Sequence, residues 1–307
     1  ATFQQLHIDR VADGLLQDVE LLVVDNNPKG KHTEITKKFM AKIHGTYIEY
    51  DEIQGTSAPR GKAIESASGE YVLCMDAHVF TMFLTESNGS LARGGLLRLV
   101  NWLKQQNPAS FKDLYHGPCI YDWLVDDKGK LSVAGTHWKE VWGSDGMFGE
   151  WETKKPYKDN PELLNTAEPF EITLAAMGLF LTSRRHWLGF HREQRGFGSE
   201  EGTIHAKYRA AGRRVLCVPW LTWLHRWGTM PGATPRPSSG AEQFLRNYML
   251  NTRDINYPTL EDLHANYVVK NRVSKATWEK LLGEMGLQYK PNGKPGDELE
   301  KLLKDIG

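Results

Sequence analysis

Residues 69–78, GEYVLCMDAH, form a short apolar run that ends in Asp76, Ala77 and His78. A run of this length, bounded by glycine on one side and by polar residues on the other, is typical of a buried strand. Residues 20–28, ELLVVDNNP, repeat the pattern, with Asp25 at the end of the run and Asn-Asn-Pro as a stop signal. We therefore predict two buried strands, each of which carries polar side chains at its carboxyl end.

Helices and a third strand are predicted around these two strands. Residues 31–44 place Ile35, Phe39 and Ile43 at helical spacing, residues 46–50 form a short strand, and residues 62–68 form a short helix. Alternation of strands and helices with short links predicts right-handed β-α-β units in a mostly parallel sheet. Ligands bind beyond the carboxyl ends of the strands in open sheets of this kind, so Asp25 and the Asp76/His78 pair are expected at one binding edge.

The rest of the chain divides by pattern. We predict a helix over 96–105, a buried segment over 173–181, a helix over 200–211 that ends at Gly212, and a strand over 215–218. Residues 228–240 hold three prolines and three glycines, so a mobile loop is expected there. Residues 1–3 look like the end of a strand before a helix over 6–16, and on this basis we expect the natural N-terminus to be missing.

These elements predict an α/β catalytic domain over residues 1–240 and a helical extension over residues 241–307. The nucleotide-binding half is expected at 1–80 and the acceptor and catalytic half at 81–240. Amphipathic stretches at 275–285 and 297–305 are the expected helices of the extension.

The bulk composition is that of an ordinary globular protein. Lys and Arg together number 38, as do Asp and Glu, and this balance counts against an obligate nucleic-acid binder. The three cysteines form no Cys-x-x-Cys pair and two lie in apolar runs, which indicates buried thiols and a reducing compartment. No apolar run is long enough to span a membrane. We expect a cytoplasmic protein.

A metal site is predicted at the end of the strand over 70–75. In an extended stretch Asp76 and His78 point the same way, and a carboxylate with an imidazole suits a divalent ion such as Mn²⁺. An Asp-x-His triplet alone is weak, since an ordinary strand-end turn also explains it. His225 strengthens the prediction, because it follows the strand over 215–218 and the turn at Pro219 and can return to the same edge. Packing among neighbouring tryptophans is its alternative explanation.

Two acids and one arginine are further candidates for the site. Glu200 and Glu201 begin a predicted helix, where the helix dipole alone favours acids. Their functional interpretation is that one of them binds the acceptor hydroxyl or takes its proton. Arg60 and Lys62 lie at the start of a short helix, which suits a phosphate group. A solvated surface turn explains them equally well.

The order of these motifs resembles the GT-A glycosyltransferases. Residues 23–26 (VVDN) and 58–78 (APRGKAIESASGEYVLCMDAH) resemble the nucleotide-binding half of that fold. The Asp-x-His form is similar to that of the polypeptide N-acetylgalactosaminyltransferases and of family 2-like relatives. Residues 175–180 (AAMGLF), 198–200 (GSE) and 219–225 (PWLTWLH) match their later motifs in order and spacing. The resemblance covers roughly residues 1–230.

The resemblance implies a GT-A-type, Rossmann-like fold and a metal-dependent glycosyltransferase. Asp25 would contact the base or ribose of the donor, and Arg60 the base or diphosphate. Asp76, His78 and His225 would bind Mn²⁺ or Mg²⁺. The reaction would move a hexosyl or N-acetylhexosaminyl group from a UDP-sugar to a hydroxyl. No lectin domain or disulfide pattern is present in the sequence, which suggests a bacterial, viral or cytosolic relative.

The acceptor and the stereochemistry stay open at this point. The acceptor is a protein, a glycan or cell-envelope polymer, or a hydroxylated DNA base of the kind that phage enzymes modify. For DNA, a basic stretch would meet phosphates; its members are Arg184, Arg185, Arg192, Arg195, Arg209, Arg213 and Arg214, with Lys270, Arg272, Lys275 and Lys280 as a possible extension. A solvated face is the alternative. Glu201 is the candidate base if the reaction inverts the anomeric centre, whereas a retaining enzyme would use a front-face reaction.

Two other function classes compete with glycosyl transfer. The first is a non-catalytic GT-A-like module that binds a nucleotide or a carbohydrate, against which the complete set of metal ligands argues. The second is a different α/β nucleotide enzyme, such as a nucleotidyltransferase, for which no glycine-rich phosphate loop is found near the start of the sequence.

Overall fold

The computed structural model describes residues 2–84, 91–93, 95–125, 131–144, 146–226 and 240–290. Its first third contains helices α1 (Thr2–Ala12), α2 (Thr33–Lys42) and α3 (Ser57–Ser66) and strands β1 (Leu22–Asp25), β2 (Thr46–Glu49) and β3 (Tyr71–Met75). The strands predicted at 20–25, 46–50 and 70–75 and the helix at 31–44 are confirmed. The helix predicted at 62–68 exists as α3 but begins earlier, at Ser57.

The start of the chain differs from the prediction. Thr2 and Phe3 belong to helix α1 and not to the end of a strand, and Ala1 lies outside the described residues. The Thr2 hydroxyl donates to the Ala77 carbonyl (2.7 Å), and the Gln5 amide donates to the Thr81 carbonyl (2.8 Å). These tertiary hydrogen bonds bind the first helical turn to the segment after β3, an effect that the local sequence does not reveal.

The central sheet is mixed, which corrects the mostly parallel sheet that we predicted. Its strand order is β11-β13-β6-β12-β3, with β6 (Leu114–His116), β11 (Phe170–Glu171), β12 (Leu179–Ser183) and β13 (Val215–Cys217). Strand β12 runs antiparallel to β3, with Leu179 opposite Met75. The chain comes to β12 from β11, at the far edge of the same sheet, with no helix between the two strands, and it enters at the carboxyl end of β3 and runs back. The predicted α/β class itself is confirmed.

A second sheet carries the segment that follows Asp76. Its order is β5-β4-β14-β7-β8, and the bounds are β4 (Val79–Leu84), β5 (Leu91–Arg93), β7 (Cys119–Val125), β8 (Leu131–Gly135) and β14 (Trp223–His225). Strand β14 pairs antiparallel with β4, so His225 lies opposite Val79, next to His78. This register brings β14, far along the chain, back to the start of β4.

Strands β1 and β2 pair with each other in parallel and form a separate two-stranded sheet. Among the described residues, β1 makes no strand pairing with β3. A cavity of about 770 Å³ lies between them, lined by both strands and by apolar residues of α1 and α4 (Leu96–Lys104). The first part of the chain is therefore built from two strand layers with a space between them.

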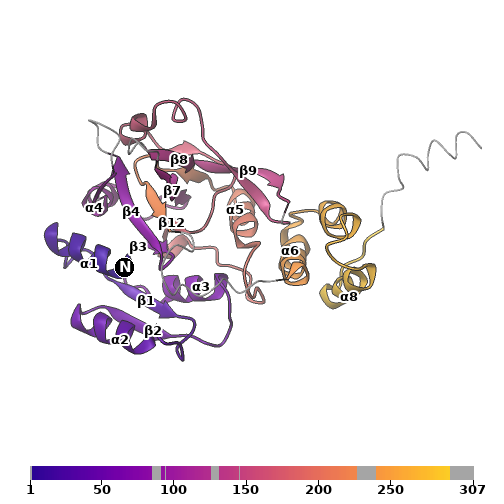
Figure 1. The fold of residues 1–307 in the computed structure, drawn as a ribbon. Helices are drawn as coiled ribbons and strands as arrows, with labels where there is room; N and C mark the ends of the chain where they lie inside the picture. The colour runs from indigo at the N-terminus through magenta and orange to yellow at the C-terminus, as the bar shows by residue number, and fades with distance from the viewer. Residues whose placement is uncertain are drawn as a thin grey trace, which may run out of the picture.

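The C-terminal helices pack onto the body of the protein (Figure 1). Helices α5 (Glu200–Ala210) and α6 (Ala241–Ile255) are neighbours, and α7 (Leu260–Leu263), η3 (His264–Val269) and α8 (Lys275–Met285) follow. Leu245 and Met249 of α6 share a core with Trp138 of β9 (His137–Trp142) and Phe148 of β10 (Phe148–Glu152). The helix predicted at 275–285 is confirmed. The helix predicted at 297–305 and the loop predicted at 228–240, apart from Gly240, lie outside the described residues.

Two further expectations concern cysteines and membranes. Cys74, Cys119 and Cys217 are all free and buried, as predicted. In the part of the chain that the structure describes, no helix combines the length and apolar character needed to cross a membrane. Within the described residues, η1 (Pro161–Asn165) and η2 (Arg184–His186) are short 3₁₀ helices, whereas η3 is a π-helix.

Candidate functional site

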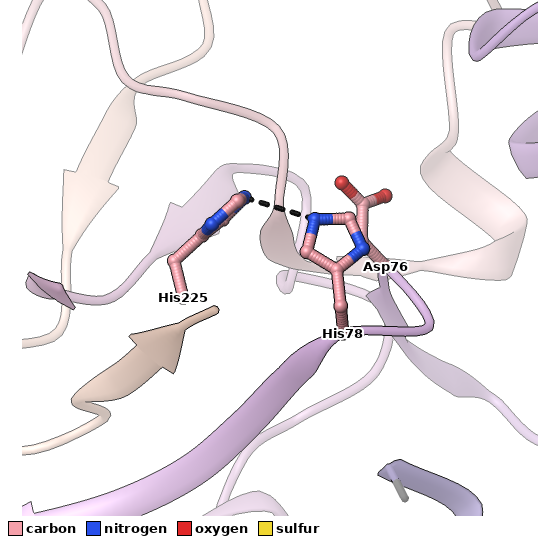
Figure 2. Close-up of side chains that lie close together, drawn as sticks. All are labelled: Asp76, His78 and His225. Carbon is pink, nitrogen blue, oxygen red and sulfur yellow. Dashed lines mark hydrogen bonds between the residues drawn. The ribbon is translucent and has the colours of Figure 1, made fainter. Parts of the chain in front are cut away.

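The three predicted metal ligands lie together (Figure 2). One oxygen of Asp76 and one ring nitrogen each of His78 and His225 fall within 4.8 Å of one another. The Nε2 atoms of the two histidines are 3.2 Å apart, and their rings meet edge to face with centroids 4.6 Å apart. His225 is buried, whereas Asp76 and His78 are half-buried and open toward solvent.

The donor set fits a divalent transition metal. Two nitrogen ligands that are each about 2.1 Å from a metal at angles between 90° and 110° lie roughly 3.0–3.4 Å apart. The 3.2 Å separation of His78 and His225 falls in this range. The same separation allows an N–H···N hydrogen bond between neutral rings, and a bound metal would take the place of the shared proton. One carboxylate and two imidazoles are ligands that Mn²⁺ accepts.

The backbone around Asp76 is fixed from two sides. The Asp76 N–H donates to the Gly178 carbonyl (3.0 Å), where the chain enters β12, and the Arg226 N–H donates to the His78 carbonyl (3.2 Å). A Cβ at Gly178 would lie 2.8 Å from the indole of Trp223 and 3.5 Å from the ring of His225. Glycine at 178 therefore lets Trp223 pack tightly behind the histidine. The antiparallel direction of β12 matters for the site, because it places Gly178 where its carbonyl accepts the hydrogen bond from Asp76 and where Trp223 packs against it.

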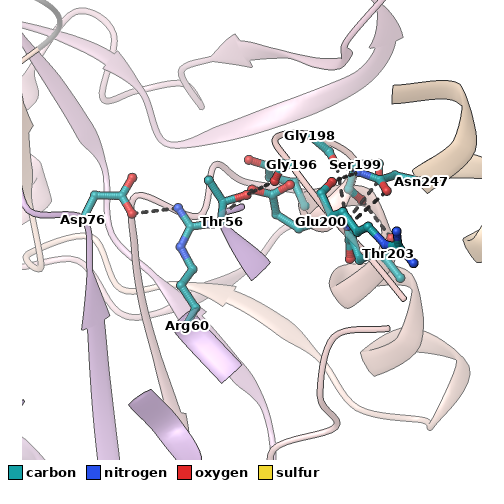
Figure 3. Close-up of polar contacts among 12 residues, drawn as sticks. Thr56, Arg60, Asp76, Gly196, Gly198, Ser199, Glu200, Thr203 and Asn247 are labelled. Atoms are coloured by element: carbon teal, nitrogen blue, oxygen red, sulfur yellow. Dashed lines mark hydrogen bonds and ion pairs between the residues drawn. The ribbon is translucent and has the colours of Figure 1, made fainter. Parts of the chain in front are cut away.

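Arg60 connects Asp76 to Glu200, the first residue of α5 (Figure 3). Residues 195–199 form the turn that leads into Glu200, and we call residues 195–200 the acidic turn. Its Nη2 donates to Asp76 Oδ1 (2.7 Å) and its Nη1 donates to Glu200 Oε1 (3.1 Å). Burial alone would lower the pKa of Arg60, but the charges of Asp76 and Glu200 outweigh burial and raise it. Arg60 is thus a permanent cation in a buried network.

Arg60 does not lie in a solvated surface turn, which is the simpler interpretation of the sequence. It lies in the fourth position of α3 and its side chain is only 9% exposed. Its predicted contact with a base or diphosphate stays a prediction, because both of its terminal nitrogens already bind protein carboxylates.

The loop before α3 lies against the acidic turn. Gly55 and Gly196 form an isolated parallel bridge, in which the Thr56 N–H donates to the Gly196 carbonyl (3.0 Å) and the Gly196 N–H to the Gln54 carbonyl (2.8 Å). The side chain of Asn26, at the end of β1, binds the same loop through the Tyr50 carbonyl (2.8 Å) and the Gly55 N–H (3.0 Å). The ends of β1 and β3 are therefore connected to the turn that carries Glu200.

Helix α6 holds that turn from the other side. The Asn247 amide donates to the Arg195 carbonyl (2.7 Å) and the Gly198 carbonyl (3.2 Å), and the Asn251 amide donates to the Ser199 carbonyl (3.4 Å). Ser199 has a φ of 71°, an uncommon conformation for a residue other than glycine, asparagine or aspartate. Sequence reasoning missed Asn247, because a buried amide in a distant helix carries no motif.

Asp25 lies at the carboxyl end of β1, as predicted, and already has several donors. Its carboxylate accepts hydrogen bonds from the Thr33 hydroxyl (3.0 Å), the Asn27 N–H (2.9 Å) and the Tyr47 hydroxyl (2.5 Å). Burial and this carboxylate raise the pKa of Tyr47 to about 12, so the phenol keeps its proton and donates. The carboxylate is therefore rigid, and its contact with the base or ribose of a donor remains a prediction.

Glu201 is buried next to Glu200 in the first turn of α5. Burial first, and then the charge of Glu200, raise its pKa from 4.5 to about 8. A carboxyl group in this state is neutral below about pH 8, and it becomes an unusually strong carboxylate base once ionised.

This shift predicts a pH-dependent stability. Because the folded-state pKa lies above the unfolded value, Glu201 contributes stability fully below about pH 4.5, and the contribution is lost as the pH rises toward 8. We expect the free energy of unfolding to fall by a few kcal/mol over this range, and Glu201→Gln to remove that component. Urea unfolding at pH 5.5, 7.0 and 8.5 checks this. Parallel curves for the two proteins would show that Glu201 does not titrate in this range.

The basic stretch is partly neutralised. Arg214 forms an ion pair with Asp113 (2.7 Å), Arg209 forms one with Glu140 (3.1 Å), and Arg213 donates to the His186 carbonyl. In the proposed extension, Lys280 pairs with Glu242 (3.2 Å) and Arg272 donates to the Gly143 and Ser144 carbonyls. These cations have local partners, which weakens the case for a phosphate-binding face. Arg184, Arg185, Arg192 and Arg195 are exposed.

Comparison with known proteins agrees with this geometry. Residues 7–83 match the sequence profile of glycosyl transferase family 2. The fold is similar to the crystal structure of GalNAc-T7 with UDP, GalNAc and Mn²⁺, with a TM-score of 0.61, 15% identity, and coverage of 94% of this chain and 51% of that one. The chain has a GT-A glycosyltransferase fold.

A more distant likeness involves a second GT-A structure. A mannosyltransferase from Pyrobaculum calidifontis, in complex with GDP-Man and Mn²⁺, gives a TM-score of 0.40 and 16% identity, with coverage of 91% of this chain and 64% of that one. No curated protein sequence matches the chain. The chain spans about half the length of the GalNAc-T7 structure.

Proposed function

We propose that this protein is a metal-dependent glycosyltransferase that moves a sugar from a UDP-sugar to a hydroxyl acceptor. The observation that carries the proposal is the convergence of Asp76, His78 and His225 within 4.8 Å at the carboxyl end of β3. Two segments far apart in sequence, residues 76–78 and His225, meet at the edge where α/β sheets bind their ligands. The family 2 match over residues 7–83, a range that includes Asp76 and His78, supports the proposal.

The chemistry needs charge neutralisation at the leaving group. When the bond between sugar and diphosphate breaks, negative charge develops on the phosphate oxygens, and a divalent metal bound at this site would neutralise it. Asp76, His78 and His225 would hold the ion. Arg60 adds a buried positive charge at Asp76, and Asp25 is the candidate contact for the base or ribose.

Glu201 is the candidate general base if the transfer inverts the anomeric centre. Its raised pKa makes the ionised group a better proton acceptor than an ordinary carboxylate. For a retaining transfer, a front-face reaction is the proposed course, in which the departing phosphate takes the acceptor proton.

The acceptor is proposed as a protein hydroxyl or a glycan. DNA is the weaker alternative, because several arginines of the basic stretch already have partners in the protein. If DNA were the acceptor, binding would weaken steeply as salt increases, and absence of DNA binding at low salt would remove this alternative.

The test is release of UDP from a panel of UDP-hexoses and UDP-N-acetylhexosamines, measured with Mn²⁺ and with EDTA. We expect one donor to be hydrolysed slowly with Mn²⁺, and EDTA to reduce the rate by about a hundredfold or more. Tight UDP binding without turnover of any donor would favour a non-catalytic module. Release of pyrophosphate from a nucleoside triphosphate would instead favour a nucleotidyltransferase.

A further inference from the structure

Arg60 binds two carboxylates with two different nitrogens. Its Nη2 reaches Asp76 Oδ1 at 2.7 Å and its Nη1 reaches Glu200 Oε1 at 3.1 Å. The side chains of Arg60 and Glu200 are 9% and 1% exposed, so this interaction is screened little by water. Figure 3 shows the guanidinium between the two acids, with Thr56 beside Glu200.

The cation bears directly on the candidate metal site. A guanidinium next to Asp76 repels a divalent ion and competes with it for the carboxylate oxygens. Glu200 opposes both effects. Its negative charge offsets that of Arg60, and its hold on Nη1 keeps the guanidinium from turning both nitrogens onto Asp76.

Glu200 is itself held in place. It accepts a hydrogen bond from the Thr56 hydroxyl, and it begins α5 directly after the turn that Asn247 and Asn251 hold. Its Oε2 atom is buried and has no hydrogen-bond partner in the described part of the structure. A carboxylate clamped between Thr56 and Arg60 is suited to fix a neighbour, and poorly suited to follow an acceptor hydroxyl through a reaction.

We infer that Glu200 is a positioning residue for the metal site and acts through Arg60. By holding Arg60, it leaves Asp76 available to the ion and lowers the net positive charge that the ion meets. The inference rests on the proposed function in one respect, which is that a divalent ion binds Asp76, His78 and His225. It gives Glu200 a role other than the predicted contact with the acceptor.

The experiment is a double-mutant cycle read by Mn²⁺ affinity in the absence of donor. Mn²⁺ is titrated calorimetrically into the full chain and into Glu200→Gln, Arg60→Met and the double variant. Glu140→Gln is the matched control, because Glu140 pairs with Arg209 at the same 3.1 Å distance. Circular dichroism verifies the fold of each protein.

We expect Glu200→Gln to weaken Mn²⁺ binding by about tenfold or more when Arg60 is present. In the Arg60→Met background the same change should cost less than about threefold, because the residue through which Glu200 acts is gone. Glu140→Gln should bind Mn²⁺ like the wild type. If Glu200→Gln alone does not fold, Arg60→Met is compared with the double variant. Neither of these two proteins buries an unpaired arginine, so their comparison still tests the second expectation.

Two results would overturn the inference and leave the proposed function intact. One is an equal loss of affinity in both backgrounds, which would mean that Glu200 acts on the ion without Arg60. The other is unchanged affinity in Glu200→Gln. Absence of Mn²⁺ binding by the wild type would overturn both the metal assignment and this inference.

Discussion

His225→Ala is expected to lower Mn²⁺-dependent release of UDP from the preferred donor by about a hundredfold or more. Loss of a residue that only orients a metal ligand already lowers metal affinity or activity by about 10–100-fold, and loss of a direct ligand should cost at least as much. His225 is also the ligand that β14 brings back to the start of β4, so its loss leaves only the Asp76/His78 pair. The measurement is kcat/KM for UDP release at several Mn²⁺ concentrations.

The control for this variant is His32→Ala, because His32 is exposed and lies at the start of α2 outside the site. It should keep the wild-type rate. If His225→Ala retains the full rate and the full Mn²⁺ dependence, His225 is not a metal ligand.

Gly55→Ala is expected to lower the free energy of unfolding by about 2–6 kcal/mol. Gly55 has a φ of 144°, where an alanine is strained, and its Cβ would lie 2.3 Å from the Gly196 carbonyl oxygen. The Cβ would also lie 2.6 Å from the Gly196 amide nitrogen, and because both atoms belong to the backbone, rotation of a side chain gives no relief. The bridge that connects the α3 loop to the acidic turn would have to open, and activity should fall together with stability.

Gly61→Ala is the matched control for this substitution. Gly61 lies inside α3, six residues away, and its Cβ would meet no atom within 4 Å. Alanine favours a helix, so stability should stay equal or rise by up to about 1 kcal/mol. Urea unfolding of the two variants makes the comparison. Equal curves for both would mean that the Gly55–Gly196 contact is not tight in solution.

Local pattern in the sequence predicted much of the site. Asp25 and Asp76 follow apolar runs that do form strands β1 and β3, and a strand end is a reliable place to expect polar ligands. His225 was found from its place after a strand and a proline turn, and the structure does bring it to His78. The places of these residues could be predicted because each depends on strand order and on short-range signals, whereas their roles stay predictions.

The contacts between distant segments could not be predicted in this way. The direction of β12 depends on the route of the chain from β11 across the sheet to the carboxyl end of β3, and this route has no periodic signature. The ion pairs of Arg60 join α3 to residues 76 and 200, and charged side chains of such separation can pair in many ways. The hydrogen bonds from Asn247 to the acidic turn depend on the packing of α6 onto α5. The apolar core that α6 shares with Trp138 and Phe148 determines this packing.

The separate C-terminal extension that we predicted at 241–307 remains a proposal. Its first helix contributes Asn247 and Asn251 to the turn of Glu200, and its side chains enter the core beside β9 and β10. The helices after residue 240 therefore help to build the site and do not merely follow it.

The most direct test of the account is an anomalous difference map from crystals of the protein grown with UDP and Mn²⁺, recorded near the manganese absorption edge. The account predicts one strong peak in contact with Asp76, His78 and His225 and with the UDP phosphates. A peak held by other residues, or UDP bound without any peak at this triad, would contradict it.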